Sequence, residues 1–315
     1  MLTSVDMKLG ADDGRPYVPV KINGSDQTML VDTGGVFTEI KSGVADALHM
    51  DQRNSPVEMI GTNGDVSTRS ARGSLVMGTL SADAIDFMVM TDTHGLDSSA
   101  AGLFAPNLLK SYDADFDFGA GKFNLISQNH CDGKVVYWPA TAVAVIPMYL
   151  DKTGHIFLTV TLDGKDMQAM LDTGASTTVL DLAYATSYFG VKPGAADTPY
   201  VATMGKNSGS YAYAHRFKTL SLEGITVSNP NIELIPDLMD RTASDAASNL
   251  EGETRIHNRD EQAALSPITL GMDVLHRFHL YIAYKERKIY ISPASAPTGP
   301  ASAGLSATAN AGTKP

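Results

Sequence analysis

The sequence has almost no cysteine and no long apolar run. Among its 315 residues Cys131 is the single cysteine, so an intrachain disulfide framework and a cysteine-rich zinc site are both excluded. The longest apolar stretch, residues 140–150, is about half as long as a membrane span and is interrupted by Thr141 and Pro147. No membrane span is therefore expected.

Positive charge is also scarce. Lys and Arg total 24 against 35 Asp and Glu, which gives a formal net charge of −11. A nucleic-acid-binding surface needs a basic face, so nucleic acid is not expected as a partner. Charged residues are 19% of the chain, below the typical ~25%, and the apolar fraction is ordinary, so a folded rather than a disordered protein is expected.

The two ends of the chain carry no targeting or core-forming pattern. The first residues lack a basic segment followed by an apolar one, so no signal peptide is predicted. The compartment stays open: periplasmic or secreted if a leader was removed ahead of Met1, and cytoplasmic otherwise. Residues 293–315 are rich in Ala, Ser, Pro and Gly with almost no apolar bulk, which predicts a disordered tail.

What the chain does contain is an internal repeat. Residues 14–40 align with residues 154–180 without a gap at an offset of 140, and 8 of the 27 paired positions are identical. Unrelated segments would share roughly two positions from average composition. The chain is therefore predicted to be a tandem duplication of one domain.

A second gapless match extends the repeat. Residues 103–126 align with residues 269–292 at an offset of 166, so the second copy is longer by 166 − 140 = 26 residues. A polar run within 236–265 is the expected place of this insertion, as a long surface loop. We therefore predict an N-terminal lobe at 1–137, a C-terminal lobe at 138–292 and the tail at 293–315.

Most apolar residues within each copy recur with the period of a β-strand. Residues 17–22 and 157–162 each lead into an Asn-Gly or Asp-Gly pair, which indicates a hairpin. Short helices are predicted at 42–50 and 181–189, the second ended by Gly190. Later strands are expected at 73–77, 85–90, 217–222 and 232–235. The pattern indicates a mainly β protein of two lobes with a few short helices.

Each copy places an aspartate directly after a buried strand and before Thr-Gly: Asp32 in the first copy and Asp172 in the second. A carboxylate there is costly unless its charge is hydrogen-bonded or shared. If the copies pack about a pseudo-twofold axis, the two carboxylates face each other and hold one proton between them. Such a pair can activate a water against a carbonyl. The residues expected to support the pair through hydroxyl and backbone N–H bonds are Thr33, Gly34, Thr173 and Gly174.

With these residues the sequence resembles the retropepsin/pepsin superfamily of aspartic proteases, as a single chain of the bacterial type with two retropepsin-like lobes. The resemblance covers about residues 5–292. One Asp-Thr-Gly would be weak evidence, but here two stand in register, each followed by a later apolar segment at residues 103–105 and 270–271. It implies the bilobal aspartic-protease fold, with two duplicated β-barrel-like lobes.

The family also closes a flexible hairpin, the flap, over its substrate. Residues 57–66 resemble a retroviral flap, and residues 203–209 occupy the same place in the second copy. Ordinary hairpins are the alternative for both segments. Glycines at such tips allow the backbone to open and to approach a peptide. The resemblance implies flap and substrate-binding roles for Ile60, Gly61, Thr62, Asn63, Gly64, Met204, Gly205, Lys206 and Asn207.

Four features depart from the family pattern. Gly35 stands where relatives carry Ser, Thr or Ala, and Ala105 stands where they prefer Gly, so the first lobe is expected to be the more affected. Ile60 replaces the flap tyrosine of pepsins, which favours the retropepsin comparison. The 31 residues before Asp32 are too few for a pepsin-type prosegment. No departure removes a carboxylate, so activity is expected.

Two other patterns suggest metal binding. Residues 113–119 imitate a calcium loop, but their glycine is one place late and Asn124 replaces the bidentate Glu, so a strand with one solvated face is preferred. His276 and His279 lack a third ligand and are predicted to be surface positions. No metal or cofactor is predicted.

The sequence thus predicts an aspartic endopeptidase, a hydrolase acting on peptide bonds. Asp32 and Asp172 would activate the water, and an extended peptide or protein substrate would bind in the cleft between the lobes. A monomer is expected. The alternatives are a catalytically weak or inactive peptide-binding protein on the same scaffold, and a structural or assembly module that uses the cleft as an interface.

Overall fold

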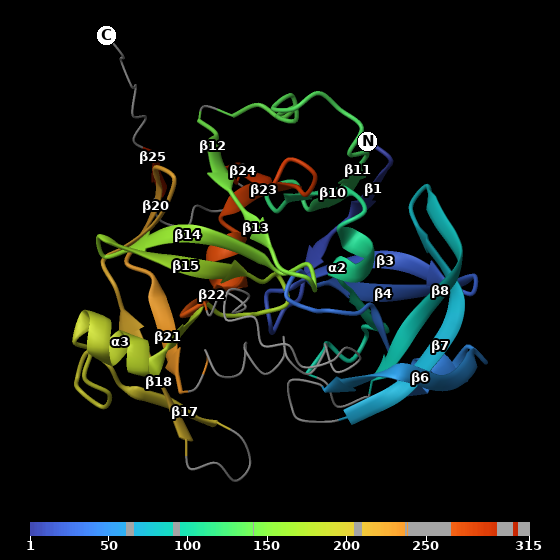
Figure 1. Ribbon diagram of the computed structural model, residues 1–315, viewed down its shortest axis with the longest axis horizontal. Helices are drawn as coiled ribbons and strands as arrows, with labels where there is room; N and C mark the ends of the chain where they lie inside the picture. The colour runs from blue at the N-terminus through green and yellow to red at the C-terminus, as the bar shows by residue number, and fades with distance from the viewer. Residues whose placement is uncertain are drawn as a thin grey trace, which may run out of the picture.

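The computed structural model places two β-rich lobes side by side, joined by a shared sheet (Figure 1). Strands make up most of the ordered elements and the helices are short, as predicted. The structure describes residues 1–60, 66–90, 95–140, 142–204, 210–236, 238, 266–294 and 305–307.

The first lobe is built on an eight-stranded sheet in the order β2-β3-β4-β9-β5-β8-β7-β6. Its hairpin between β3 and β4 turns at Asn23 and Gly24, whose φ angles of 49° and 82° are those that a tight turn between twisted strands requires. The strands are β2 (Lys8–Leu9), β3 (Pro16–Ile22), β4 (Ser25–Val31), β5 (Glu39–Lys41), β6 (Asp51–Ile60), β7 (Val66–Met77), β8 (Leu80–Met90) and β9 (Gly102–Phe104), and the helices are α1 (Ser42–Ala47) and α2 (Pro106–Leu109).

The second lobe repeats this design in a larger sheet, ordered β17-β18-β21-β16-β22-β15-β14-β19-β20-β25, with β13 paired to β14. Its strands are β13 (Tyr149–Leu150), β14 (Ile156–Leu162), β15 (Lys165–Leu171), β16 (Val179–Asp181), β17 (Tyr200–Met204), β18 (Ser210–Arg216), β19 (Thr219–Leu222), β20 (Ile225–Ser228), β21 (Asn231–Ile235), β22 (Ile268–Leu270) and β25 (Leu305–Ala307), and its helices are α3 (Leu182–Phe189) and α5 (Met272–Leu275). The parallel pairing of β15 with β22 repeats that of β4 with β9.

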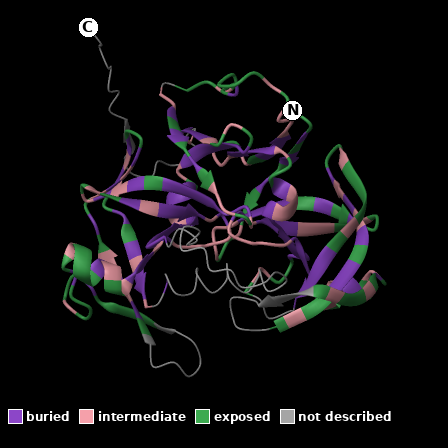
Figure 2. Cartoon of the chain, in the orientation of Figure 1, coloured by how far each residue is buried: buried purple, intermediate pink, exposed green. Residues whose placement is uncertain are grey.

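A six-stranded sheet joins the lobes, in the order β1-β11-β10-β23-β24-β12. Its strands are β1 (Thr3–Asp6), β10 (Asp113–Asp117), β11 (Lys122–Ile126), β12 (Ala144–Pro147), β23 (Phe278–Ala283) and β24 (Lys288–Pro293). The two central strands, β10 and β23, are equivalents in the repeat and pair antiparallel with each other. Buried residues line this sheet and the inner strands of both lobes (Figure 2). The duplication is therefore arranged about a pseudo-twofold axis.

Two predictions about β10 and β23 were wrong. Asp113 and Asp115 are fully buried, so β10 has no solvated face, and His279 is only 2% exposed rather than a surface residue. The physical reason is that β23 of the other lobe brings an imidazole to β10: His279 Nε2 lies 2.6 Å from Asp115 Oδ1. Trp138 then stacks on the imidazole, with ring centroids 4.1 Å apart.

Parts of several predictions lie outside the described residues. The backbone of β6 and β7 forms the first predicted hairpin and that of β17 and β18 the second, but residues 61–65 and 205–209 at their tips are not described. The same holds for residues 239–265 of the insertion. In the tail, residues 305–307 form β25 against β20. No helix in the described part of the chain is long and apolar enough to cross a membrane.

Candidate active site

The two Asp-Thr-Gly loops begin where β4 and β15 end. Asp32 and Asp172 each follow the last residue of their strand, and each donates its backbone N–H to the strand that runs parallel to it. The acceptors are the carbonyl oxygens of Phe104 and Leu270, both at 3.0 Å. The later apolar segment of each copy therefore holds the start of its aspartate loop in the same way.

The threonines of the two loops bond to each other across the pseudo-twofold axis. The N–H of Thr33 donates to Oγ1 of Thr173 at 3.1 Å, and the N–H of Thr173 donates to Oγ1 of Thr33 at 3.0 Å. Each hydroxyl in turn donates to the backbone of the opposite strand, at Leu171 and Val31. Both threonines are fully buried, so these bonds satisfy groups that water cannot reach.

The glycines bring each carboxyl group against the opposite loop. A methyl group built on Gly34 would lie within 2.5 Å of all three carboxyl atoms of Asp172, and one on Gly174 within 2.7 Å of those of Asp32. Any side chain at either glycine would thus occupy the space of the opposite carboxyl. Two carboxyl groups buried this close together cannot both be ionised, so the pair shares one proton.

The two carboxyl groups differ in their donors. Oδ1 of Asp32 accepts the N–H groups of Gly34 and Gly35 at 2.8 and 2.9 Å, whereas Oδ1 of Asp172 accepts that of Gly174 at 2.7 Å. Burial, followed by the charge of Asp32, raises the pKa of Asp172 to about 7. Burial also raises the pKa of Asp32, against the lowering effect of its two N–H donors. The second N–H favours Asp32 as the charged member of the pair.

The departures at Gly35 and Ala105 fit into this geometry. Gly35 lacks a side-chain hydroxyl, but its N–H is one of the two donors to Asp32. Ala105 is fully buried and its N–H donates to Oγ1 of Thr38 at 3.2 Å, as the N–H of Gly271 does to Thr178 at 3.1 Å. The alanine therefore keeps the hydrogen bond of its equivalent glycine.

A pair of buried threonines that the sequence interpretation missed braces both loops. The N–H and hydroxyl of Thr38 donate to Oδ1 of Asn107 at 2.8 and 2.9 Å, and those of Thr178 donate to Oδ1 of Asp273 at 2.8 and 2.7 Å. The repeat contained the signal, because Asn107 and Asp273 are separated by the offset of 166 and both carry a short side-chain oxygen.

Three ionisable residues near the two Asp-Thr-Gly loops were also missed. Arg15 and His155 occupy equivalent positions in the repeat, just ahead of β3 and β14. Glu39 is the third: it is 7% exposed, and burial, followed by the charge of Asp32, raises its pKa to about 8. Its equivalent in the second lobe is the apolar Val179.

Neither the predicted flap residues nor a metal site can be added to this geometry. The side chains of Ile60 and Met204 and the whole of residues 61–65 and 205–209 lie outside the described residues. Within the described part of the chain, no three His, Cys, Asp or Glu side chains are grouped to hold a metal ion.

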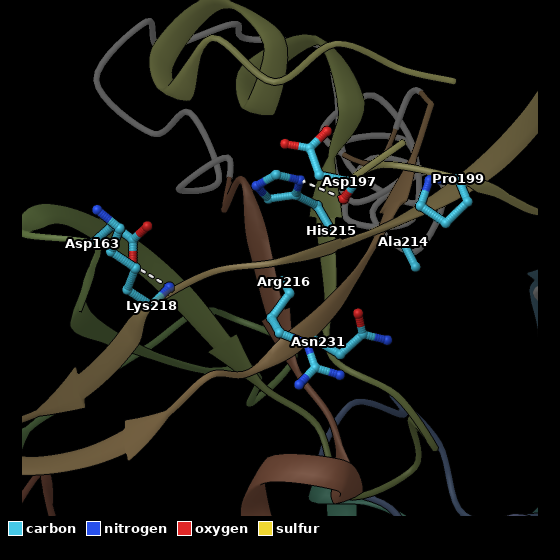
Figure 3. Close-up of a pocket in the computed structure, with 8 residues that line it drawn as sticks. All are labelled: Asp163, Asp197, Pro199, Ala214, His215, Arg216, Lys218 and Asn231. Atoms are coloured by element: carbon cyan, nitrogen blue, oxygen red, sulfur yellow. Dashed lines mark hydrogen bonds between the residues drawn. The ribbon is translucent and has the colours of Figure 1, made fainter. Parts of the chain in front are cut away.

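A separate cavity of about 570 Å³ lies on the second lobe and contains no residue of the Asp-Thr-Gly loops (Figure 3). Its charged side chains are committed to local turns or exposed: Asp163 accepts the N–H of Lys218 at 2.8 Å, and His215 Nδ1 lies 3.1 Å from the carbonyl of Asp197. No two carboxyl groups face each other there. The lining residues are Asp163, Asp197, Pro199, Ala214, His215, Arg216, Lys218 and Asn231.

Two duplicated β lobes whose Asp-Thr-Gly loops meet at a shared pair of carboxyl groups define the bilobal architecture of pepsin-like and retropepsin-like aspartic proteases. The family model described as aspartyl protease matches residues 18–104 and 158–274, so each copy of the repeat matches it once. The chain belongs to this aspartyl protease family.

Solved structures with the same fold are distant in sequence. Basic 7S globulin from soybean is 11% identical, with a TM-score of 0.51 over 92% of this chain and 95% of that one. Conglutin gamma, a basic 7S globulin from lupine seeds, is 10% identical, with a TM-score of 0.52 over 92% and 94%. No curated protein sequence matches the chain significantly. These likenesses establish the fold.

Proposed function

We propose that the protein is an aspartic endopeptidase that hydrolyses peptide bonds with a water held between Asp32 and Asp172. The observation that carries this proposal is the pair of buried carboxyl groups, each of which lies against a glycine of the opposite loop that has no side chain. A buried pair that shares one proton offers an acid and a base at the same point. Membership of the aspartyl protease family supports the same reaction.

The chemistry divides between the two carboxyl groups. The ionised member, which we assign to Asp32 because it accepts two N–H bonds, takes a proton from the water as the water oxygen attacks the substrate carbonyl carbon. The protonated member, Asp172, donates its proton toward the carbonyl oxygen. The proton taken from water then passes to the leaving amine as the C–N bond breaks. A hydroxyl proton of the tetrahedral intermediate returns to Asp172 as the carbonyl re-forms, so the pair regains its singly protonated state.

The substrate is proposed to be an extended peptide segment that lies in the cleft between the lobes and pairs with strand edges through its backbone. The hairpins β6–β7 and β17–β18 would cover it, with Ile60 to Gly64 and Met204 to Asn207 as the contacting residues. Because one chain supplies both aspartates, a monomer suffices for activity, and the reaction needs no cofactor.

Cleavage of a mixed peptide library from about pH 3 to about pH 9 tests the proposal. Cleavage is expected to fall as the pH rises through the pKa of Asp172, about 7, because the pair then loses its shared proton. Asp32→Asn and Asp172→Asn should each lower kcat by roughly 10²–10⁴-fold. Gln168→Glu on β15, outside the loops, is a matched control for expression and handling. Cleavage by both Asn variants at the wild-type rate would overturn the proposal.

The peptide-binding alternative has a distinct outcome in the same experiment. Retained binding of peptides from the library, with no cleavage at any pH, would identify a non-catalytic binding protein on this scaffold. An assembly module would neither cleave nor bind them. Binding of pepstatin is a quicker indication, but retropepsin-like proteins that resist pepstatin make it less decisive than cleavage.

A further inference from the structure

His155 lies on the same face of the sheet as Asp172. Strands β14 and β15 pair antiparallel with Ile156 opposite Leu171, and one further step of this register places His155 opposite Asp172. Directly opposite residues of an antiparallel pair point to the same face, with Cβ atoms about 4.5–5.5 Å apart. The imidazole therefore stands beside the carboxyl pair, on the side that belongs to the second lobe.

The ring of His155 is held by Asp151 at the start of its loop. Nδ1 lies 3.2 Å from Oδ2 of Asp151 and 3.0 Å from Oγ1 of Thr153. The Thr153 hydroxyl donates to Oδ1 of Asp151 at 2.6 Å, so it accepts rather than donates at the imidazole. Nδ1 therefore carries a hydrogen, and Nε2 is the nitrogen that gains or loses a proton.

Nε2 of His155 is buried and has no hydrogen-bond partner among the residues that the structure describes. The residue as a whole is 8% exposed. A buried polar nitrogen without a partner costs free energy, and such groups in folded proteins ask for an explanation. The three bonds that fix Asp151 and Nδ1 hold the ring rigid, so Nε2 cannot turn to the solvent.

The equivalent residue of the first lobe is a permanent cation. Arg15 is held by Asp13 through Nε at 2.9 Å, and its guanidinium reaches the carbonyl oxygens of Gly174 at 3.4 Å and Gly95 at 2.6 Å. Both lobes thus place a basic group, anchored by an aspartate of its own loop, near the Asp-Thr-Gly loops. In the second lobe alone this group can lose its charge near neutral pH.

We propose that His155 is a positioning residue whose protonated imidazole keeps the Asp32–Asp172 pair in its singly ionised state. The reaction it would serve is the proposed peptide hydrolysis, on which this inference rests. The charged groups that act on the ring are Asp151 on its own loop and Asp172 and Asp32 on the two Asp-Thr-Gly loops. The stem of Lys110, which follows α2, lies beside the neighbouring residue Gly154.

The direction of titration agrees with this geometry. Burial alone would lower the pKa of His155, but the hydrogen bond and charge of Asp151, together with the charges of Asp172 and Asp32, raise it above its ordinary value. Asp151 itself remains ionised: the bonds from His155 and Thr153 outweigh burial and lower its pKa to about 2. The raised pKa extends to higher pH the range in which the imidazole stays charged, and the charge is lost as the pH rises through that pKa.

A titration of the imidazole by NMR tests the coupling without any need for activity. The His155 signal is assigned by its loss in His155→Gln, and its pKa is compared in the wild-type protein, Asp172→Asn and Asp32→Asn. Linkage requires that removal of a neighbouring negative charge lowers the pKa of His155. The signal of His215, far from the pair on the second-lobe cavity, should not move. An unchanged pKa for His155 in both folded Asn variants would overturn the proposal.

The pH dependence of kcat/KM gives the second test. Without the cation the ionised carboxyl is less stable, so both limbs of the profile of His155→Gln should move to higher pH by roughly half a unit or more. His155→Lys, which restores a positive charge, should move them back, and His215→Gln should leave them in place. A lower kcat with both limbs unmoved would mean a structural role and overturn the proposal. Absence of cleavage at every pH in the wild-type protein would instead contradict the proposed function, and the NMR titration would still decide the coupling.

Discussion

The two lobes carry the same backbone around the carboxyl pair but different charges. In the first lobe Arg15 is a permanent cation, Asp32 accepts two N–H bonds and Glu39 lies close by. In the second lobe the cation is His155 and Asp172 accepts one N–H bond. Duplication kept the bonds that shape the loops and changed the groups that set their electrostatics.

The difference in charges shows that two lobes with the same backbone can hold two carboxyl groups of unequal proton affinity. Two carboxyl groups in identical surroundings would compete equally for the shared proton, whereas an additional N–H donor on one side favours the anion there. The bonds repeated in both lobes include those of Thr33 with Thr173 and the braces at Thr38 and Thr178. These bonds fix the conformation of the two Asp-Thr-Gly loops, which must be alike for the carboxyl groups to face each other.

The largest effect is expected at the glycines that face the pair. Gly34→Ala and Gly174→Ala should each lower kcat/KM by roughly 100-fold or more, because the new methyl group would displace the opposite carboxyl. Gly35→Ala is the matched control: its methyl group would lie 3.2 Å or more from the nearest atoms, so only a few-fold loss is expected. Comparable losses of kcat/KM in all three variants would mean that the contact between the new methyl group and the opposite carboxyl is not the cause.

A smaller effect is expected in the six-stranded sheet that joins the lobes. Asp115 is fully buried and pairs with His279, and Asn124 Nδ2 also donates to its Oδ2 at 2.7 Å. Asp115→Ala should lower the free energy of unfolding by about 3–5 kcal/mol, because it removes the 2.6 Å partner of buried His279 and the acceptor of Asn124. Urea denaturation measures this. Asp6→Ala, which removes an exposed pair with Lys122 at the edge of the same sheet, should leave the midpoint unchanged.

The reciprocal threonines test the symmetry itself. Thr33→Val and Thr173→Val should each destabilise the protein by about 1–3 kcal/mol, because each removes the acceptor of a buried N–H and a donor to a buried carbonyl oxygen of the other lobe. Serine at either position keeps the hydroxyl and should restore most of the loss. Thermal unfolding measures the loss of stability. Destabilisation by only one of the two valine variants would contradict equal contributions from the two threonines.

The smallest effect concerns the helix that follows each loop. Asp181 caps α3 by accepting the N–H of Tyr184 at 2.8 Å, whereas its equivalent Lys41 makes no side-chain cap at α1. Asp181→Ala should cost about 1 kcal/mol, and Asp181→Asn, which can still accept, should cost less. Chemical denaturation with both variants checks this, and equal costs would show that the cap bond is not the cause.

Much of the fold could be predicted from local patterns. The hairpin at Asn23 and Gly24 follows from residues that accept a left-handed backbone, and Gly190, at φ 72°, ends α3 where predicted. The predicted strand at residues 217–222 begins later, at Thr219, because Phe217 instead bonds by its N–H to Pro230. Local propensity predicts that an element exists better than it predicts where the element begins.

The duplication and the equivalent places of the two Asp-Thr-Gly loops can be read from the amino-acid sequence, because the spacing of residues along a chain does not depend on how the chain packs. Tertiary structure alone decided which charges surround those loops. Asp115 contacts His279, which is 164 residues away in the sequence. The imidazole of His155 interacts electrostatically with Asp32 in the other lobe. Such contacts depend on how the two lobes pack. The burial of a residue, which shifts its pKa, is set only by that packing.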